Sequence, residues 1–266
     1  MICTRLFAVG CLAVVPAVGW SYTNAFTLTF EQASDADHFS DTANSASVIA
    51  AGENAAIDNP PYSVKPEVAT GYNGTKWLRT GNSDTTMYGV ATFAYDGFAG
   101  GGGTVQDFEA TVDVFINPQF SDPNNSANPL RHQVGLMGRW TSGNNAFMVF
   151  YSRGTPNYAD GFGWRYGGST ATWGEFTTAT LSSPRWVRLK THMQDNIAQM
   201  SVDQDLDGTY DYISPEITVA VNPGQLALQS VINDPNNGSK QLPDRFAYWD
   251  NLHYVPLASV SEWSLY

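Results

Sequence analysis

The feature that most constrains the fold is a two-residue alternation of apolar and polar side chains. In residues 107–116, DFEATVDVFI, the apolar positions fall on one face of an extended chain and the polar positions on the other: Phe108, Ala110, Val112, Val114 and Ile116 against Glu109, Thr111 and Asp113. Period two over nine residues is typical of a half-buried β-strand. Strand signals also dominate residues 132–140, 145–153, 185–203 and 246–255, and no segment has a convincing helical period.

About a dozen short strands without helices predict an all-β fold, a two-sheet antiparallel sandwich of the jelly-roll type. Asp195 and Asn196 are expected to form a two-residue turn between two strands. The glycine-rich residues 97–105 are interpreted as a loop within one domain, because strand patterns resume on both sides. We expect one domain over residues 26–256, with 257–266 as a short tail.

The first 25 residues have the pattern of a secretory signal peptide. Arg5 precedes an apolar run over residues 6–15, and small residues follow, so cleavage is expected after Gly19 or Ala25. Both cysteines, Cys3 and Cys11, lie inside this segment, so the secreted chain would contain no disulfide. No second apolar run approaches the roughly 18 residues that a membrane span needs.

The net charge of −12 narrows the classes of partner. An acidic chain repels phosphate backbones and anionic lipid headgroups, so neither nucleic acid nor a membrane surface is an expected partner. The same charge is compatible with neutral sugars and with calcium, and equally with an acidic surface that only keeps a secreted protein soluble.

The order of several segments resembles the concanavalin A-like (LamG-like) sandwich superfamily. These segments are FTLTFEQ, FEATVDVFI, HQVGLMGRW with NNAFMVFYSR, WVRLKTHM followed by VDQDLDG, and FAYWDNLHY. The resemblance implies a concanavalin A-like sandwich, in a superfamily that includes lectins, glycan-binding modules, glycosidases, lyases and adhesion domains. The fold by itself therefore does not select a function.

The segments that would carry catalysis in such relatives are incomplete. Sandwich glycosidases of this superfamily have an E-x-D-x-E strand, whereas here Thr111 stands between Glu109 and Asp113. Of the motifs of alginate-lyase-like relatives only Arg131, His132 and Gln133 offer a match, and the four histidines lack metal-ligand spacing. We therefore predict no catalytic residue, with a polysaccharide hydrolase or lyase as the less favoured alternative.

The segment VDQDLDGTYDYI, residues 202–213, has the spacing of a calcium loop. Side chains of Asp203, Asp205, Asp207 and Asp211, with the carbonyl of Thr209, would form an oxygen cage, and Gly208 would allow the bend. The glutamate that an EF-hand needs at the twelfth position is replaced by Ser214. The alternative is a strand end followed by an Asp-Gly turn, with Asp203 and Asp205 merely solvated.

A second calcium site is implied by the resemblance alone. Carbohydrate-binding sandwiches similar to this chain often bring a first-strand glutamate and a last-strand aspartate to one structural ion, here Glu31 and Asp250. The alternative is that Asp250 and Asn251 form hydrogen bonds with a neighbouring loop.

Three aromatic residues are candidates for stacking on sugar rings. Trp164, Tyr166 and Trp173 lie in the glycine-flanked segment GWRYGGSTATWG. A place in the core is the alternative, and it is the expectation for Trp77, Trp186 and Trp249, which sit in apolar strands.

These observations predict a secreted, non-catalytic module that binds glycans at the cell surface or in an extracellular matrix. The alternative from another class is a structural subunit of an envelope, matrix or filament. A sugar binder needs exposed aromatic rings, whereas a structural subunit needs an extended apolar patch or an unpaired strand edge.

Overall fold

A computed structural model describes residues 25–40, 45–50, 76–81, 88–95, 105–116, 131–141, 146–153, 160–167, 172–178, 181–220, 222–233 and 246–257. The predicted signal peptide up to residue 24 and the tail beyond residue 257 lie outside this part of the chain. The described residues form sixteen strands and one short 3-10 helix. No helix among them is long and apolar enough to cross a bilayer.

One sheet has nine strands and carries Asp203 and Asp250, one residue from each of the two predicted calcium sites. Seven strands form its main path, and β1 and β14 join it beside β16 and β12. In sheet order these are β13 (Tyr212–Ile213), β12 (Ile197–Asp203), β11 (Arg185–Gln194), β6 (Phe108–Ile116), β16 (Phe246–Pro256), β4 (Lys76–Gly81) and β3 (Ser45–Ala50), with β1 (Phe26–Leu28) and β14 (Ile217–Thr218).

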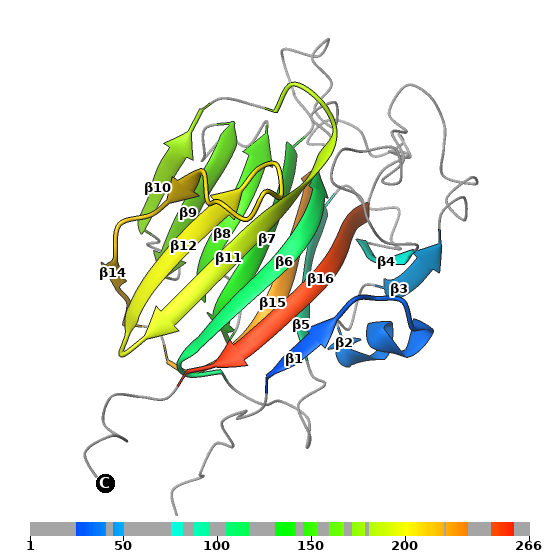
Figure 1. Ribbon diagram of the computed structural model, residues 1–266, viewed down its shortest axis with the longest axis horizontal. Coiled ribbons are helices and arrows are strands. Elements are labelled where there is room, and N and C mark those ends of the chain that lie inside the picture. Colours follow the sequence, from blue (N-terminus) through cyan, green and yellow to red (C-terminus); the bar gives the residue numbers. More distant parts are fainter. Residues whose placement is uncertain are drawn as a thin grey trace, which may run out of the picture.

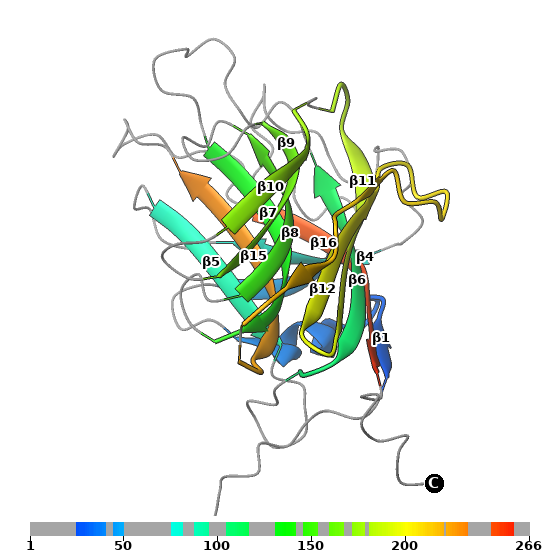
Figure 2. The same ribbon diagram turned by 90° about the vertical axis from the view of Figure 1, so that its left-hand side faces the viewer.

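The other sheet has seven strands and carries the candidate aromatic residues. Its order is β10 (Thr172–Thr177), β9 (Gly161–Gly167), β8 (Ala146–Arg153), β7 (Arg131–Trp140), β15 (Gln225–Asn233), β5 (Tyr88–Tyr95) and β2 (Phe39–Ser40). Figure 1 looks onto the nine-stranded sheet, and Figure 2, turned by 90°, shows the two sheets as facing layers. All described pairings are antiparallel, so the predicted two-sheet antiparallel sandwich is confirmed.

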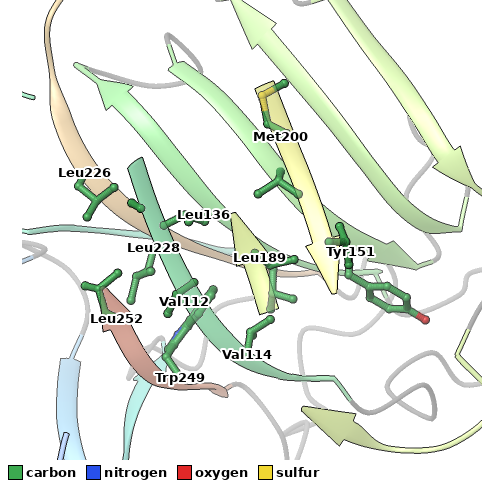
Figure 3. Packing of buried hydrophobic residues seen from close by; sticks show 14 of the residues in the cluster. Val112, Val114, Leu136, Tyr151, Leu189, Met200, Leu226, Leu228, Trp249 and Leu252 are labelled. Atoms are coloured by element: carbon green, nitrogen blue, oxygen red, sulfur yellow. The ribbon is translucent and has the colours of Figure 1, made fainter. Parts of the chain in front are cut away.

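The core lies between the sheets and is built from the inward positions of the alternating strands. Val112 and Val114 of β6 and Leu189 of β11 meet Leu136 and Leu228 of the other sheet in one buried cluster (Figure 3). Trp249 belongs to this cluster, and its indole Nε1 donates to the Thr80 hydroxyl at 2.7 Å. The alternation in the sequence therefore marks the buried face of these strands correctly.

The segment FTLTFEQ, residues 26–32, forms only a short strand. Residues 25–32 have a strand pattern, but β1 ends at Leu28, and a 3-10 helix, η1 (Ala33–His38), follows. Phe30 takes a left-handed φ of 54° and is fully buried, in ring contact with Phe39 at 6.0 Å. Burial of this ring redirects the chain, and six 3-10 residues are too few to show a helical period in the sequence.

The β11–β12 hairpin positions the acidic loop. Asp195 and Asn196 have φ values of 51° and 63°, as a two-residue turn with left-handed residues requires, so the predicted turn is confirmed. Asn196 Oδ1 accepts a hydrogen bond from the buried Arg139, and Asp107 accepts the backbone N–H of Asp195. The start of β12 is thereby anchored to β7 and to the residue that precedes β6, and the strand runs from this anchor to Asp203.

Candidate functional site

Four ionisable side chains lie in line across the face of the nine-stranded sheet that is turned away from the other sheet. The strand register places Asp203 of β12 opposite Arg188 of β11, Arg188 opposite Asp113 of β6, and Asp113 opposite Asp250 of β16. Directly opposite residues of an antiparallel pair share a face. We call these four residues the charged row.

The centre of the charged row is a two-point ion pair. Arg188 Nε donates to Asp113 Oδ1 at 2.7 Å, and its Nη2 donates to Oδ2 at 2.9 Å. Asn251 Nδ2 adds a third donor to Asp113 Oδ2 at 3.0 Å. The hydrogen bonds and charge of Asp113 raise the pKa of Arg188 against the opposing effect of burial. Asp113 is therefore compensated although it is buried.

Asp203, at one end of the row, is not compensated in the same way. Only 1% of its surface is exposed. Its Oδ2 accepts the backbone N–H of Gly208 at 3.0 Å, while its Oδ1 is buried without a hydrogen-bond partner in the described part of the chain. Asp203 is the last residue of β12, as the turn alternative expects, but it is buried rather than solvated. A buried carboxylate oxygen without a donor is costly unless a cation or another ligand is bound there.

The loop after β12 brings two more carboxylates to Asp203. Ligand oxygens of Asp203, Asp205 and Asp211 all lie within 4.8 Å of one another, and the side chains of Asp205 and Asp211 are exposed. Asp211 Oδ2 also accepts the N–H of Gln204 at 2.7 Å. Among the described residues this is the one group of three acidic, histidine or cysteine side chains drawn so close together.

The other predicted ligands of the loop are placed differently. Asp207 lies outside the group, and its Oδ1 accepts the N–H of Thr209 at 2.7 Å in a local turn. Gly208 has a φ of 89°, as the predicted bend requires, and nothing approaches the position of its missing side chain within 4 Å. The structure thus brings together three of the four predicted aspartates and leaves the Asp207–Thr209 turn beside them.

The donor set of the loop suits a hard cation. The three side chains offer only carboxylate oxygens, which are the ligands that Ca²⁺ prefers. Two of them are exposed, so water could complete the six to eight positions that Ca²⁺ takes. The unpartnered Asp203 Oδ1 is available to such an ion at the buried side of the site.

Asp250 and Glu31, the pair implied by the resemblance, lie near each other at the opposite end of the row. Burial raises the pKa of Asp250 to about 7; the N–H of Asn251 opposes this rise, and the charges of Asp113 and Glu31 add to it. Asp250 Oδ1 accepts that N–H at 2.8 Å, and Glu31 Oε1 accepts the N–H of Lys76 at 3.3 Å. Asn251, rather than Asp250, reaches a neighbouring strand, because its side chain donates a hydrogen bond to Asp113 of β6.

The carboxylates considered for catalysis are held in ion pairs. Glu109 Oε2 lies 2.8 Å from Lys190 Nζ and 3.3 Å from His192 Nδ1. Burial raises the pKa of Glu109, but the hydrogen bond and charge of Lys190, followed by those of His192, bring it below the usual value. A general acid needs a raised pKa, so this environment disfavours Glu109 in that role.

The lyase-like segment is described only in part. Gln133 is buried in β7, and the side chains of Arg131 and His132 lie outside the described residues.

The three candidate aromatic residues do not share one surface. Trp164 and Tyr166 of β9 point into the sandwich and pack against its core. Trp173 of β10 is opposite Arg165, on the other face of the sheet, and is 43% exposed. Glu175, two residues further on, is exposed as well. Trp249 is buried in the core between the sheets, as expected, and Trp77 and Trp186 are also buried, but in a separate cluster.

Sequence reasoning missed the role of Arg188. The alternation RWVRLKTH already places Arg188, Lys190 and His192 on a polar face. The partner of Arg188, however, is Asp113, 75 residues away, and only the strand register identifies it.

Comparisons with known proteins find similar solved structures. No family model and no curated protein matches the chain. A carbohydrate-binding module, CBM66, from Bacillus subtilis is 16% identical, with 71% of this chain and 97% of that chain covered and a TM-score of 0.42. The exoplasmic/lumenal domain of VIP36 in its Ca²⁺/Man-bound form is 9% identical, with 70% and 80% covered and a TM-score of 0.42.

A third solved structure, a native glycosidic hydrolase, is 12% identical, with 90% of this chain and 99% of that chain covered and a TM-score of 0.42. Likenesses this distant do not carry a ligand or an activity over to the present chain. The concanavalin A-like and laminin-G-like assignments both stay predictions.

Proposed function

We propose that this protein is a secreted, non-catalytic glycan-binding β-sandwich in which a calcium ion, held by Asp203, Asp205 and Asp211, stabilises the loop after β12. The observation that carries the proposal is the buried Oδ1 of Asp203, which has no hydrogen-bond partner among the described residues and belongs to a convergent group of three carboxylates. In a solvated turn this oxygen would be hydrated, whereas in a cation site a buried oxygen beside two other carboxylates would bind the ion.

Calcium should raise the melting temperature by a few degrees. An ion that binds only the folded state stabilises it by RT ln(1 + [L]/Kd). With calcium near 1 mM and a weak extracellular-type site of ~10⁻⁴ M, this is about 1.4 kcal/mol. About 1 kcal/mol shifts the melting temperature of a domain of this size by roughly 2–4 °C. The measurement is thermal unfolding in millimolar calcium and again in chelator.

Matched variants of the same loop separate the ligands from their neighbour. Asp205→Asn combined with Asp211→Asn should abolish the difference between the two buffers, because both carboxylates belong to the convergent group. Asp207→Asn should keep most of it, because Asp207 lies outside that group and accepts the Thr209 N–H. Wild-type protein that melts identically in both buffers would leave the loop as a turn only.

Glycan binding is proposed at the outward face of β9 and β10. Trp173 presents an exposed ring there, and the exposed Glu175 lies two residues further along the same edge strand, whereas Arg165 directly opposite Trp173 is buried. An aromatic ring with a carboxylate beside it suits stacking on a sugar together with hydrogen bonds from its hydroxyls.

A glycan-array screen with and without calcium tests this site. We expect Trp173→Ala to abolish binding to the glycans that the wild type binds on the array. Ile213→Ala is the matched control, because Ile213 is also an exposed apolar residue but belongs to the nine-stranded sheet. Binding that is equally strong in Trp173→Ala and wild type would remove this face from the proposal.

A structural subunit is the second candidate, because β10 is the terminal strand of its sheet in the described structure and exposes Trp173. Sedimentation measurements that found assembly lost in Trp173→Ala, with no glycan bound by the wild type, would favour it. The ion pair of Glu109 with Lys190 disfavours a polysaccharide hydrolase or lyase. An assay that found such an activity in wild type and its loss in Glu109→Gln would favour an enzyme.

A further inference from the structure

A cluster of four aromatic side chains lies on the same outward face as the charged row. Its members come from four strands, β4, β6, β11 and β16. It consists of Trp77, Phe115, Trp186 and Tyr248, which we call the outer aromatic cluster. Phe115 lies 5.9 Å from Trp186 and 6.1 Å from Tyr248 between ring centroids, and Tyr248 lies 6.3 Å from Trp77. All four are buried, although their strands turn them away from the main core.

The acidic loop packs one residue against this cluster. Leu206 is partly buried there, and it stands between Asp205 and Asp207 in the sequence. Figure 2 shows the segment after β12 on the side of the nine-stranded sheet that faces away from the seven-stranded sheet. One short loop therefore holds the convergent carboxylates and places an apolar side chain on the aromatic rings.

The physical forces on this loop oppose one another. Leu206 has a φ of 60°, a left-handed conformation that a leucine rarely adopts, and the nearby carboxylates repel one another. Burial of the leucine side chain favours the closed arrangement. A cation between Asp203, Asp205 and Asp211 would remove the repulsion and so favour the same arrangement.

We propose that the loop is a calcium-controlled latch, in which cation binding and the packing of Leu206 on the outer aromatic cluster stabilise each other. This inference rests on the proposed calcium site and adds a regulated contact to it. Coupling between two events is reciprocal: if calcium favours the seated leucine, the seated leucine raises the affinity for calcium. Removal of calcium then releases Leu206 from the aromatic cluster.

Calorimetric titration of calcium into wild type and Leu206→Ala tests the latch. We expect the alanine variant to bind calcium about tenfold more weakly, because truncation removes part of a leucine's burial free energy and leaves every carboxylate in place. Leu206→Met, which keeps a flexible apolar side chain of similar volume, should bind within a few-fold of wild type. The methionine variant also keeps the test valid if Leu206→Ala folds poorly.

A second measurement follows the cluster itself. Tryptophan emission and its quenching by acrylamide, recorded in calcium and in chelator, should differ in wild type and in Leu206→Met, and the difference should be much smaller in Leu206→Ala. Wild type that binds no calcium would overturn both the calcium site and the latch. Wild type and Leu206→Ala with equal affinities and equal emission changes would overturn the latch alone and leave the calcium site standing.

Discussion

Asp250 should make the protein less stable as the pH rises through neutrality. Its pKa is raised from an ordinary value of 3.8 to about 7, chiefly by burial, with the charges of Asp113 and Glu31 adding to the rise. A group whose pKa is higher in the folded state stabilises that state below its unfolded pKa, and this contribution is lost as the pH rises through the folded pKa.

The magnitude follows from these two values. Between pH 5 and pH 8 a carboxyl group with a folded pKa near 7 and an unfolded pKa near 3.8 loses roughly 2–3 kcal/mol of folding free energy. The charged groups that act on Asp250 are two carboxylates, that of Asp113, which is ion-paired with Arg188, and that of Glu31. Neither provides a positive charge that would favour the ionised form of Asp250.

The assay is urea unfolding of wild type and Asp250→Asn at pH 5, 6, 7 and 8, in chelator so that no cation can neutralise the group. We expect the difference in unfolding free energy between the two proteins to change by roughly 2–3 kcal/mol over this range, with the variant gaining on wild type as the pH rises. Parallel pH profiles for the two proteins would refute the reasoning. Added calcium that flattens the wild-type profile would support the second ion implied at Glu31 and Asp250.

Two further predictions concern the packing that holds the sandwich together. Thr80→Val should lower the free energy of unfolding, measured in urea, by about 1–3 kcal/mol, because it leaves the buried Trp249 Nε1 without its acceptor. Thr191→Val is the matched control and should be neutral or slightly stabilising, because the buried Thr191 hydroxyl has no hydrogen-bond partner among the described residues. Gly174→Ala should lower the melting temperature by several degrees, because its Cβ would lie 2.4 Å from Cζ2 of Trp164 and overpacking costs about 1–3 kcal/mol; an unchanged melting curve would show that Trp164 can move aside.

Alternation along the chain predicts which side chains of the long strands point into the core. In β6 and β11 the apolar positions found by period two are buried between the sheets, and the Asp195–Asn196 turn was evident from two residues. These features are local, because successive side chains of a strand point to opposite faces whatever the partner strand is. Burial of Asp113, Phe115 and Trp186 on the outward face was not predicted by the alternation. Prediction failed locally where burial of Phe30 redirected the chain into η1.

The way these local pieces meet depends on tertiary contacts. Trp164 and Trp173 look equivalent in sequence, but the register of β9 and β10 turns one into the core and the other to solvent. Asp203, Asp205 and Asp207 likewise have equal standing in the D-x-D-x-D-G pattern of residues 203–208, yet the path of the loop separates Asp207 from the other two. Register and loop path depend on contacts between residues far apart in the chain, such as Arg188 with Asp113, and no local period encodes them.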